Sequence, residues 1–378
     1  MVLLLAALAA CAGRENASQG QNAPVASGRP DTVQPSRDTM PPTPRMQRPA
    51  VLRGLYVNRW AALGDRMWQL IEIAKRTEVN ALVIDVKDDR GLVLYRSQVP
   101  LAREILADTT MPLSDRRLHA ILDSMRLYGI FPIARIVVAK DPLLAEAKRE
   151  WAIRRKSDGQ PWIDKNGKPW LDPHHREVWA YAAGLADEAI RAGFGEVQFD
   201  YVRFPDEERL VREASFPLAN GRARAQVIHE QLAFLHDRLR AQHVPMSIDV
   251  FGLTTTDSSD MGIGQQWEKF VDVTDFVQPM TYPSHYAPGT YGLGNPNAHP
   301  YETLDHALKD AKQRSAGIAN AAPVVPWYQD FTLGAPHYGA EQLRAQMKAG
   351  YDNGIMSWLL WNAGSKYTVE ALRPDSTR

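Results

Sequence analysis

Short apolar runs alternate with helical patterns along the chain from Val51 onward, and this alternation is the main structural signal in the sequence. The runs are rich in β-branched and aromatic side chains, as buried strands are. They predict eight strands, at residues 51–57, 81–86, 131–138, 196–202, 245–251, 276–282, 324–328 and 355–361. The amphipathic stretches between them predict helices at residues 66–77, 114–128, 176–192, 223–242, 265–270, 301–315 and 339–349.

The order of these elements indicates the fold class. Strands that alternate with helices are typical of α/β proteins with a parallel sheet. Eight such strands predict a (β/α)8 TIM barrel. A doubly wound open sheet is the alternative, but no glycine-rich phosphate-binding fingerprint follows the first strand. We therefore expect residues 50–378 to form a TIM-barrel domain.

The connection after the third predicted strand, residues 140–173, is unusually long. It contains two sequences typical of tight turns, Ser-Asp-Gly-Gln at 157–160 and Asn-Gly at 166–167. It also carries Trp151, Trp162 and Trp170, which either stack on a ligand or pack in a core. Long connections within a compact domain are usually functional or disordered, so we expect this insertion to be either functional or disordered.

The amino-terminal segment differs in composition from the rest of the chain. Residues 1–11 end in Leu-Ala-Ala-Cys and resemble a bacterial lipoprotein signal peptide, whose cysteine is lipidated and becomes the mature amino terminus. Residues 12–49 are rich in Pro, Ser, Gln, Asn and Thr, which predicts a disordered tether. We therefore expect a lipid anchor on Cys11 and a location in the cell envelope, on the periplasmic face, the outer membrane or the cell surface.

The charge balance and the cysteine content bear on nucleic-acid binding and on disulfide formation. Lys plus Arg equals Asp plus Glu at 44 each, so no net field attracts nucleic acid. Cys11 is the sole cysteine, so no disulfide forms within the chain. No other segment approaches the roughly 18 consecutive apolar residues of a transmembrane helix.

Polar side chains recur toward the carboxyl ends of the predicted strands. In a parallel barrel these ends meet on one face, where barrel enzymes carry their chemistry. Successive strands supply Asp85 and Lys87, Arg135, Gln198 and Asp200, Asp249, Gln278 and Tyr282, Trp327 and Asp330, and Trp361 and Asn362. Two-residue alternation places Asp85 and Lys87 on one face of the second strand, so we expect both to join this group.

Asp200 is the most informative of these residues, because it lies near the end of an otherwise apolar strand. A carboxylate there costs several kcal/mol unless it is paired, hydrogen-bonded or solvated. One interpretation is structural, with Asp200 as an ion-pair partner of Arg203 or a cap of the following loop. The other is a functional carboxylate at a cleft, and the recurrence of polar groups at the other strand ends favours it.

Several aspartates beside cations and a ring of Trp and Tyr suit carbohydrate chemistry. Paired carboxylates with separated pKa values act as acid and as nucleophile or base. We predict Asp200 as nucleophile or transition-state stabiliser. The first candidate for the general acid is Asp249, followed by Asp85 and then Asp330.

Other residues in the group are predicted to tune the charge of the carboxylates or to bind the sugar. A nearby cation lowers a carboxylate pKa, and this is the role expected of Lys87 and Arg203. The substrate-binding candidates are Lys87, Arg135, Arg203, Gln278, Tyr282, Trp327, Asp330, Trp361 and Asn362. The mechanism requires no metal and no cofactor.

Several motifs occur in order along the chain: Gly54-Leu-Tyr-Val-Asn58, Asn80-Ala-Leu-Val-Ile-Asp-Val-Lys-Asp-Asp89, Leu171-Asp-Pro, Phe199-Asp-Tyr-Val-Arg-Phe-Pro205, Gln278-Pro-Met-Thr-Tyr-Pro283 and Trp358-Leu-Leu-Trp-Asn362. With them the chain resembles the putative glycoside hydrolase domain family, long catalogued as a domain of unknown function, from about residue 51 to 370. The resemblance implies a TIM barrel related to glycosidases, with a catalytic aspartate at the end of the fourth strand, here Asp200. It leaves the second carboxylate and the glycan open.

Three hypotheses follow. The first is hydrolysis of a cell-envelope or extracellular polysaccharide. The second is a non-catalytic glycan-binding lipoprotein on a barrel scaffold. The third is a lyase or isomerase of sugars or sugar acids, with Lys87 as base or Schiff-base former, since barrels host many chemistries.

Overall fold

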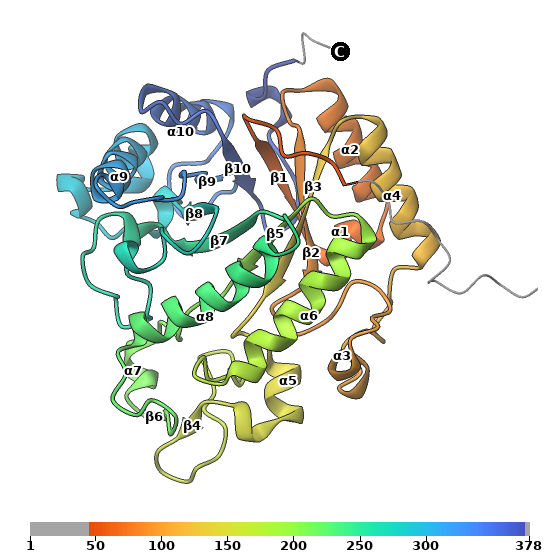
Figure 1. Ribbon diagram of the computed structural model, residues 1–378. Helices are drawn as coiled ribbons and strands as arrows, with labels where there is room; N and C mark the ends of the chain where they lie inside the picture. Colours follow the sequence, from red (N-terminus) through yellow and green to blue (C-terminus); the bar gives the residue numbers. More distant parts are fainter. Residues whose placement is uncertain (1–44, 375–378) are drawn as a thin grey trace, which may run out of the picture. The chain divides into compact units, whose positions relative to one another are not determined.

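The structure is a computed structural model that describes residues 45–374, and its centre is a closed barrel of parallel strands (Figure 1). The strands are β1 (Arg53–Val57), β2 (Ala81–Lys87), β3 (Phe131–Val137), β5 (Glu196–Asp200), β7 (Met246–Phe251), β8 (Phe276–Met280), β9 (Trp327–Gln329) and β10 (Trp358–Trp361). Around the barrel their order is β1-β10-β9-β8-β7-β5-β3-β2. The predicted TIM barrel is confirmed, and closure of the sheet excludes the doubly wound alternative.

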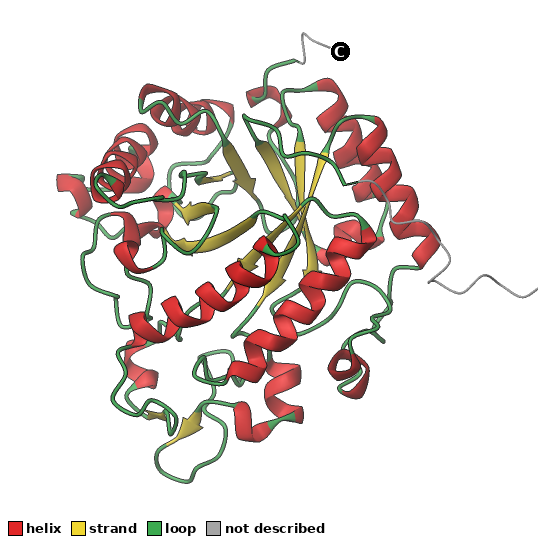
Figure 2. Cartoon of the chain, viewed as in Figure 1, coloured by secondary structure: helices red, strands yellow, loops and turns green. Residues whose placement is uncertain are grey.

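Helices cover the outside of the barrel (Figure 2). They are α1 (Arg59–Leu63), α2 (Arg66–Arg76), α3 (Pro100–Glu104), α4 (Asp115–Leu127), α5 (Pro142–Ala147), α6 (Arg176–Ala192), α7 (Glu208–Val211), α8 (Arg224–Arg240), α9 (Pro300–Ser315) and α10 (Ala340–Asp352). Helix α6 has the predicted bounds and ends at Gly193, whose φ of 114° suits a residue without a side chain. Its buried side chains include Trp179 and Leu185, and full burial of a large apolar side chain stabilises the fold by about 1.5–3 kcal/mol.

The predicted helix at residues 265–270 is wrong except for one 3-10 turn, Trp267–Lys269. The preceding Gly262 and Gly264 have φ values of 68° and 81°, outside the helical region. The side chain of Gln265 is buried, and its Oε1 accepts a hydrogen bond from the Phe251 amide at 2.9 Å. The segment therefore serves as a loop that supports the end of β7.

The insertion after β3 folds as a small unit against the loop that follows β5. Its strand β4 (Arg154–Arg155) pairs antiparallel with β6 (Ala214–Ser215). Bridges from Arg154 to Pro161 and from Ile163 to Pro169 close hairpins at the two predicted turns. Trp162 and Trp170 are buried in a separate apolar cluster. The insertion is thus ordered, and these two tryptophans contribute to packing.

The amino-terminal end of the barrel is closed by the first described residues. The Arg48 guanidinium pairs with Glu196, the first residue of β5, at 2.7 Å. Arg45 donates to the carbonyl of Gln242, and Met46 packs on the apolar cluster inside the barrel. Residues 45–49, the last part of the predicted tether, therefore lie against the barrel.

The remaining amino-terminal predictions, including the lipidation of Cys11, lie outside the described residues. Within residues 45–374, no helix has both the length and the apolar character required to cross a membrane.

Candidate active site

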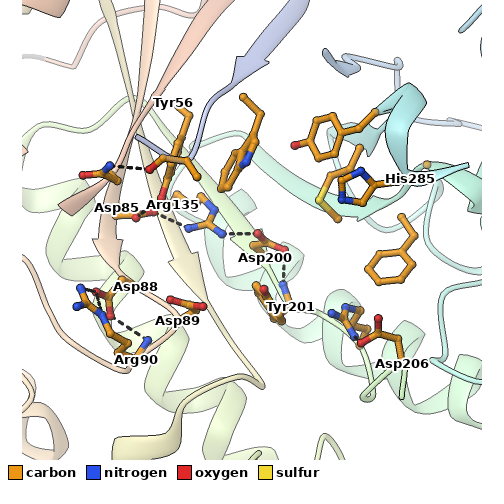
Figure 3. A pocket seen from close by; sticks show the side chains of 18 of the residues that line it. Tyr56, Asp85, Asp88, Asp89, Arg90, Arg135, Asp200, Tyr201, Asp206 and His285 are labelled. Atoms are coloured by element: carbon orange, nitrogen blue, oxygen red, sulfur yellow. Dashed lines mark hydrogen bonds and ion pairs between the residues drawn. The ribbon is translucent and has the colours of Figure 1, made fainter. Parts of the chain in front are cut away.

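A cavity of about 750 Å³ opens at the carboxyl ends of the strands, and we call it the barrel-mouth cavity (Figure 3). It is lined by Tyr56, Asn58, Arg59, Trp60, Asp85, Asp88, Asp89, Arg90, Arg135, Lys165, Asp200, Tyr201, Arg203, Asp206, Phe251, Gly252, Leu253, Met280, Tyr282, His285, Tyr286, Trp361 and Ala363. Loops after most strands and the insertion contribute to this lining. The position matches the end of the barrel at which TIM-barrel enzymes place their active sites.

Arg135 is the central cation of the site. It projects from β3, is 4% exposed, and pairs through Nη1 with Asp85 and through Nη2 with Asp200, both at 2.5 Å. Figure 3 shows the guanidinium between the two carboxylates. Burial alone would lower the pKa of Arg135, but the charges of Asp85 and Asp200 raise it well above its usual range. The arginine therefore stays charged and fixes the two carboxylates on either side of itself.

Asp200 is held at the end of β5 by a guanidinium and a backbone amide. Its Oδ2 accepts from Arg135, and its Oδ1 accepts from the backbone amide of Tyr201 at 2.5 Å. Tyr201 has a φ of 53°, in the left-handed region that non-glycine residues seldom occupy. Strain of this kind clusters at functional sites, where the surrounding structure enforces it. Here the left-handed turn directs the amide toward the carboxylate.

Asp85 is the cavity carboxylate whose pKa is displaced toward neutrality. Burial raises the pKa of Asp85 to about 6, although the charge of Arg135 and a hydrogen bond from Tyr56 oppose the shift. The Tyr56 hydroxyl donates to Asp85 at 2.5 Å, and its ring stacks on Trp361 with centroids 3.9 Å apart. A carboxyl group with this pKa retains a proton at mildly acidic pH, as a general acid requires.

Asp249 lies on β7 next to Asp200 of β5 but does not line the cavity. It is 1% exposed, accepts a hydrogen bond from the Trp327 indole at 2.6 Å, and has Arg135 Nε at 3.7 Å. Burial and then the charge of Asp200 raise the pKa of Asp249 well above its usual range, and its carboxyl group hydrogen-bonds with Asp200. Asp249 therefore holds a proton against Asp200.

Lys87 lies outside the barrel lumen, so the predicted alternation is wrong at this point. The pairing of β2 with β3 shifts by one residue between Asp85 and Lys87, and this irregularity turns Lys87 away from the face of Asp85. Its Nζ pairs with Asp141 at 2.7 Å and donates to the carbonyl of Val137 at 2.6 Å. Lys87 is therefore a structural cation behind the barrel wall.

The other predicted residues divide into two groups. Arg203, Tyr282 and Trp361 line the barrel-mouth cavity together with Asp85, Arg135 and Asp200. The Tyr282 hydroxyl has no hydrogen-bond partner among the described residues, and burial followed by the charges of Asp249 and Asp200 raises its pKa well above the usual range. The hydroxyl is therefore neutral, and it is buried instead of being exposed to the cavity.

The residues of the second group do not line the cavity. Gln278 hydrogen-bonds with Gln198 inside the barrel, and Trp327 holds Asp249. Asp330 accepts hydrogen bonds from the amide and hydroxyl of Thr368, and Asn362 donates to the carbonyl of Asp330. The last two therefore secure the carboxyl-terminal segment.

Sequence reasoning missed several residues of the cavity. Tyr56 alternates with Gly54 on β1, and this period-two signal would have placed it inside the barrel with Asp85. Asp88 lines the wall and is paired with Arg90 through an Nε contact of 3.0 Å. His285 lies on the loop after β8, where no periodic signal is available. Among residues 45–374, no group of three or more His, Cys, Asp or Glu side chains is arranged to hold a metal ion.

Comparison with known families identifies the domain. A family model described as putative glycosyl hydrolase domain matches residues 54–367. The chain belongs to this family. The resemblance inferred from the sequence motifs is thereby confirmed, and the barrel with its mouth cavity is the glycosyl hydrolase-like domain of this chain.

Three solved structures are similar to this chain, and the two with TM-scores above 0.5 share its fold. A hypothetical protein from Ruminiclostridium thermocellum is 36% identical over 52% of this chain and 97% of that one, with a TM-score of 0.47. The glycoside hydrolase domain of PgaB (BpsB) from Bordetella bronchiseptica is 13% identical over 85% of this chain and 99% of that one, with a TM-score of 0.60. The carboxyl-terminal domain of a putative chitinase from Desulfitobacterium hafniense is 11% identical over 85% and 97%, with a TM-score of 0.53. No curated protein matches the sequence.

Proposed function

We propose that this protein hydrolyses glycosidic bonds in a cell-envelope or extracellular polysaccharide. One observation carries the proposal: two carboxylates of an open cavity, Asp85 and Asp200, are bridged by the buried guanidinium of Arg135. Glycosidases use a pair of carboxylates that flank the scissile bond. Membership of a glycosyl hydrolase-like family supports the same reaction class.

The two carboxylates have different environments, which supports different roles for them. Asp200 accepts from a cation and an amide, so it acts as the anionic nucleophile or as stabiliser of the oxocarbenium-like transition state. Asp85, with a pKa of about 6, is the general acid that protonates the leaving oxygen. Asp249 does not reach the cavity, and its proton hydrogen-bonds to Asp200 and limits the negative charge there.

Aromatic side chains beside the carboxylates suit a sugar ring. Trp361 and Tyr56 stack on each other at the cavity, and Tyr282 also lines it. Aromatic faces bind the apolar faces of pyranose rings. Lys87, by contrast, is paired with Asp141 away from the cavity, so a Schiff-base reaction gains no support.

The proposal includes anchoring at the cell envelope through Cys11. The described chain begins beside Gln242 and Glu196 at the amino-terminal end of the barrel, opposite the barrel-mouth cavity. Labelling with a radioactive fatty acid tests this part, because Cys11→Ser would abolish the label.

The central test compares two carboxylate variants on the same strand. Asp200→Asn removes the proposed nucleophile at the top of β5, and Glu196→Gln alters the structural carboxylate at its start. We measure reducing ends released from peptidoglycan, chitin and uronate-containing polysaccharides. Asp200→Asn should lower turnover by about 10³-fold or more, while Glu196→Gln keeps full turnover per folded molecule.

The outcome separates hydrolysis from plain glycan binding. Circular dichroism and a urea titration show whether both variants are folded. Retained turnover in Asp200→Asn would remove that residue from catalysis. Glycan binding that survives in Asp200→Asn, with no reducing ends released by the unmodified protein, would favour the non-catalytic glycan-binding lipoprotein.

A further inference from the structure

Arg203 forms part of the cavity wall on the side of the insertion, and its setting is unusual for a charged side chain. The side chain is only 8% exposed. Its guanidinium carbon lies 5.1 Å from the ring centroid of Trp170, 4.9 Å from that of Tyr201 and 4.5 Å from that of Phe251. Three rings thus fix the guanidinium in place by cation–π contact.

The hydrogen bonds of Arg203 use one of its three nitrogens. Nη1 donates to the carbonyl of Phe204 at 3.0 Å and to Asp206 at 3.1 Å. Among the described residues, Nε and Nη2 have no hydrogen-bond partner. These two nitrogens form one edge of the planar guanidinium. Neither is among the buried atoms that lack a partner, so the edge is accessible and can donate to an incoming acceptor.

The same edge binds carboxylates elsewhere in this protein. Arg314 donates through Nε and Nη2 to the two oxygens of Glu268, at 2.7 and 2.6 Å. Paired N–H groups in this arrangement match the geometry of a carboxylate. The edge of Arg203 that has no partner is therefore shaped for a planar anion with two oxygens.

Charges of both signs surround Arg203. Lys165, from the insertion, lines the same cavity and is exposed. The carboxylate of Asp206 is 44% exposed and engages Nη1, on the opposite side of the guanidinium from Nε. Glu207 accepts a hydrogen bond from the Lys165 amide at 3.2 Å, so its carboxylate lies beside that lysine. The attraction for an anion therefore comes from the accessible edge of Arg203 and not from a net positive field.

We propose that Arg203 forms a subsite for a sugar-borne carboxylate, so that the polysaccharide acted on is acidic. This inference rests on the proposed hydrolase function and names its substrate class. The carboxylate belongs to a uronic acid or to a lactyl ether on an amino sugar, which share the same chemistry. The carboxylates bridged by Arg135 act on the neighbouring glycosidic bond.

The test pairs each acidic glycan with its neutral counterpart. Polygalacturonate, hyaluronan and peptidoglycan strands are each compared with a form whose carboxyl groups have been reduced to alcohols. Cleavage is measured as kcat/KM from reducing ends, and binding as retardation of the full chain in gels that contain the glycan. Polygalacturonate and hyaluronan represent uronates, and peptidoglycan represents the lactyl carboxylate.

Three variants isolate the guanidinium. Arg203→Met keeps an unbranched apolar side chain but removes the charge, and Arg203→Lys keeps the charge but not the fork. Arg224→Met is the matched control, because Arg224 also stacks on two rings, Phe204 and Phe216, and does not line the cavity. Urea titrations establish that each variant is folded.

We expect the unmodified protein to prefer one acidic glycan over its reduced form by about tenfold or more in kcat/KM. Arg203→Met should remove that preference, Arg203→Lys should retain part of it, and Arg224→Met should leave it unchanged. Equal cleavage of acidic and reduced forms, or an equal loss on both in Arg203→Met, would overturn the subsite while leaving the hydrolase function intact.

Gel retardation distinguishes a failure of the proposed hydrolase function from a failure of the proposed carboxylate subsite. If no glycan is cleaved but retardation by an acidic glycan depends on Arg203, the hydrolase function fails and the subsite stands. If neither cleavage nor Arg203-dependent retardation occurs with any acidic glycan, the subsite is overturned as well.

Discussion

An arginine pairs with carboxylate at each end of the barrel lumen, yet the two ends differ in charge balance. At the amino-terminal end, Glu196 accepts from Arg48 through one oxygen and from Ser247 through the other, each at 2.7 Å. The guanidinium of Arg48 lies 3.4 Å from the centroid of the Phe276 ring, which closes this end. One cation meets one carboxylate there, and both Glu196 oxygens are satisfied.

At the carboxyl-terminal end, one guanidinium faces three carboxyl groups. Arg135 pairs directly with Asp85 and Asp200, and Asp249 lies 3.7 Å from its Nε. Such a cluster can be buried because protons offset the excess negative charge, as the raised pKa values of Asp85 and Asp249 indicate. The lower end therefore stabilises the barrel, while the upper end keeps protons that can be transferred.

The largest effect on stability is expected from removal of the charge of Arg135. Arg135→Met leaves Asp85 and Asp200 buried without their partner, and breaking a buried pair of this kind costs about 3–5 kcal/mol. Urea denaturation at neutral pH measures the free energy of unfolding. Adding Asp85→Asn to Arg135→Met should recover part of the loss, because it removes one of the uncompensated charges.

Arg48→Met is the matched change at the lower end and serves as the control. It removes one charge-assisted hydrogen bond to Glu196, which corresponds to about 1.5–3 kcal/mol, and should leave kcat/KM unchanged. If Arg135→Met lowered the free energy of unfolding no more than Arg48→Met, or if both variants changed kcat/KM equally, the two ends of the barrel would not have different roles.

The pH dependence of Asp85 is expected to be the next largest effect. Its pKa is 3.8 when unperturbed and about 6 in the folded protein, so the folded state binds the proton more tightly. The stability from Asp85 is therefore fully present below pH 3.8 and is lost as pH rises through about 6, by about 3 kcal/mol in all. Urea titrations across this range should give a smaller pH dependence for Asp85→Asn than for the unmodified protein.

Catalysis offers a second measurement of the same group. If Asp85 is the general acid, kcat/KM falls as pH rises above about 6, because the proton needed by the leaving group is lost. A profile that stays flat from pH 5 to 8 would assign the acid role to another residue, since no group with this pKa would then control turnover.

The sequence predicted which residues meet at the carboxyl-terminal end of the barrel better than it predicted how their side chains are arranged. Parallel strands end on one face, so Asp85, Arg135 and Asp200 could be brought together from their positions within apolar runs alone. The orientation of Lys87 could not be predicted, because one register shift in the β2–β3 pairing cancels the two-residue alternation on which the prediction rested. The hydrophobic pattern contains no signal for such a bulge.

Which strand-end carboxylate reaches the cavity could not be predicted from the sequence either. Asp200 and Asp249 follow the last paired residues of the β5–β7 ladder, Phe199 and Ile248, yet only Asp200 lines the cavity. Asp249 is held instead by the Trp327 indole from β9, and a contact between these strands depends on the closed barrel and not on any one strand. The order of candidates for the general acid therefore changes from Asp249 to Asp85.

The smallest effect is expected at Asp249, and it tests whether Asp85 replaces Asp249 as the general acid. In Asp249→Asn, the amide oxygen can still accept from the Trp327 indole, and the amide N–H can replace the proton that Asp249 holds toward Asp200. We expect the free energy of unfolding to change by less than about 1 kcal/mol and kcat/KM by only a few-fold, because protonated Asp and Asn present the same donor and acceptor. Asp249→Leu is the contrasting variant, since it leaves both the indole and Asp200 without a partner. A hundredfold loss of kcat/KM in a folded Asp249→Asn protein would show instead that Asp249 transfers its proton during the reaction, and the upper cluster would then act through a buried relay.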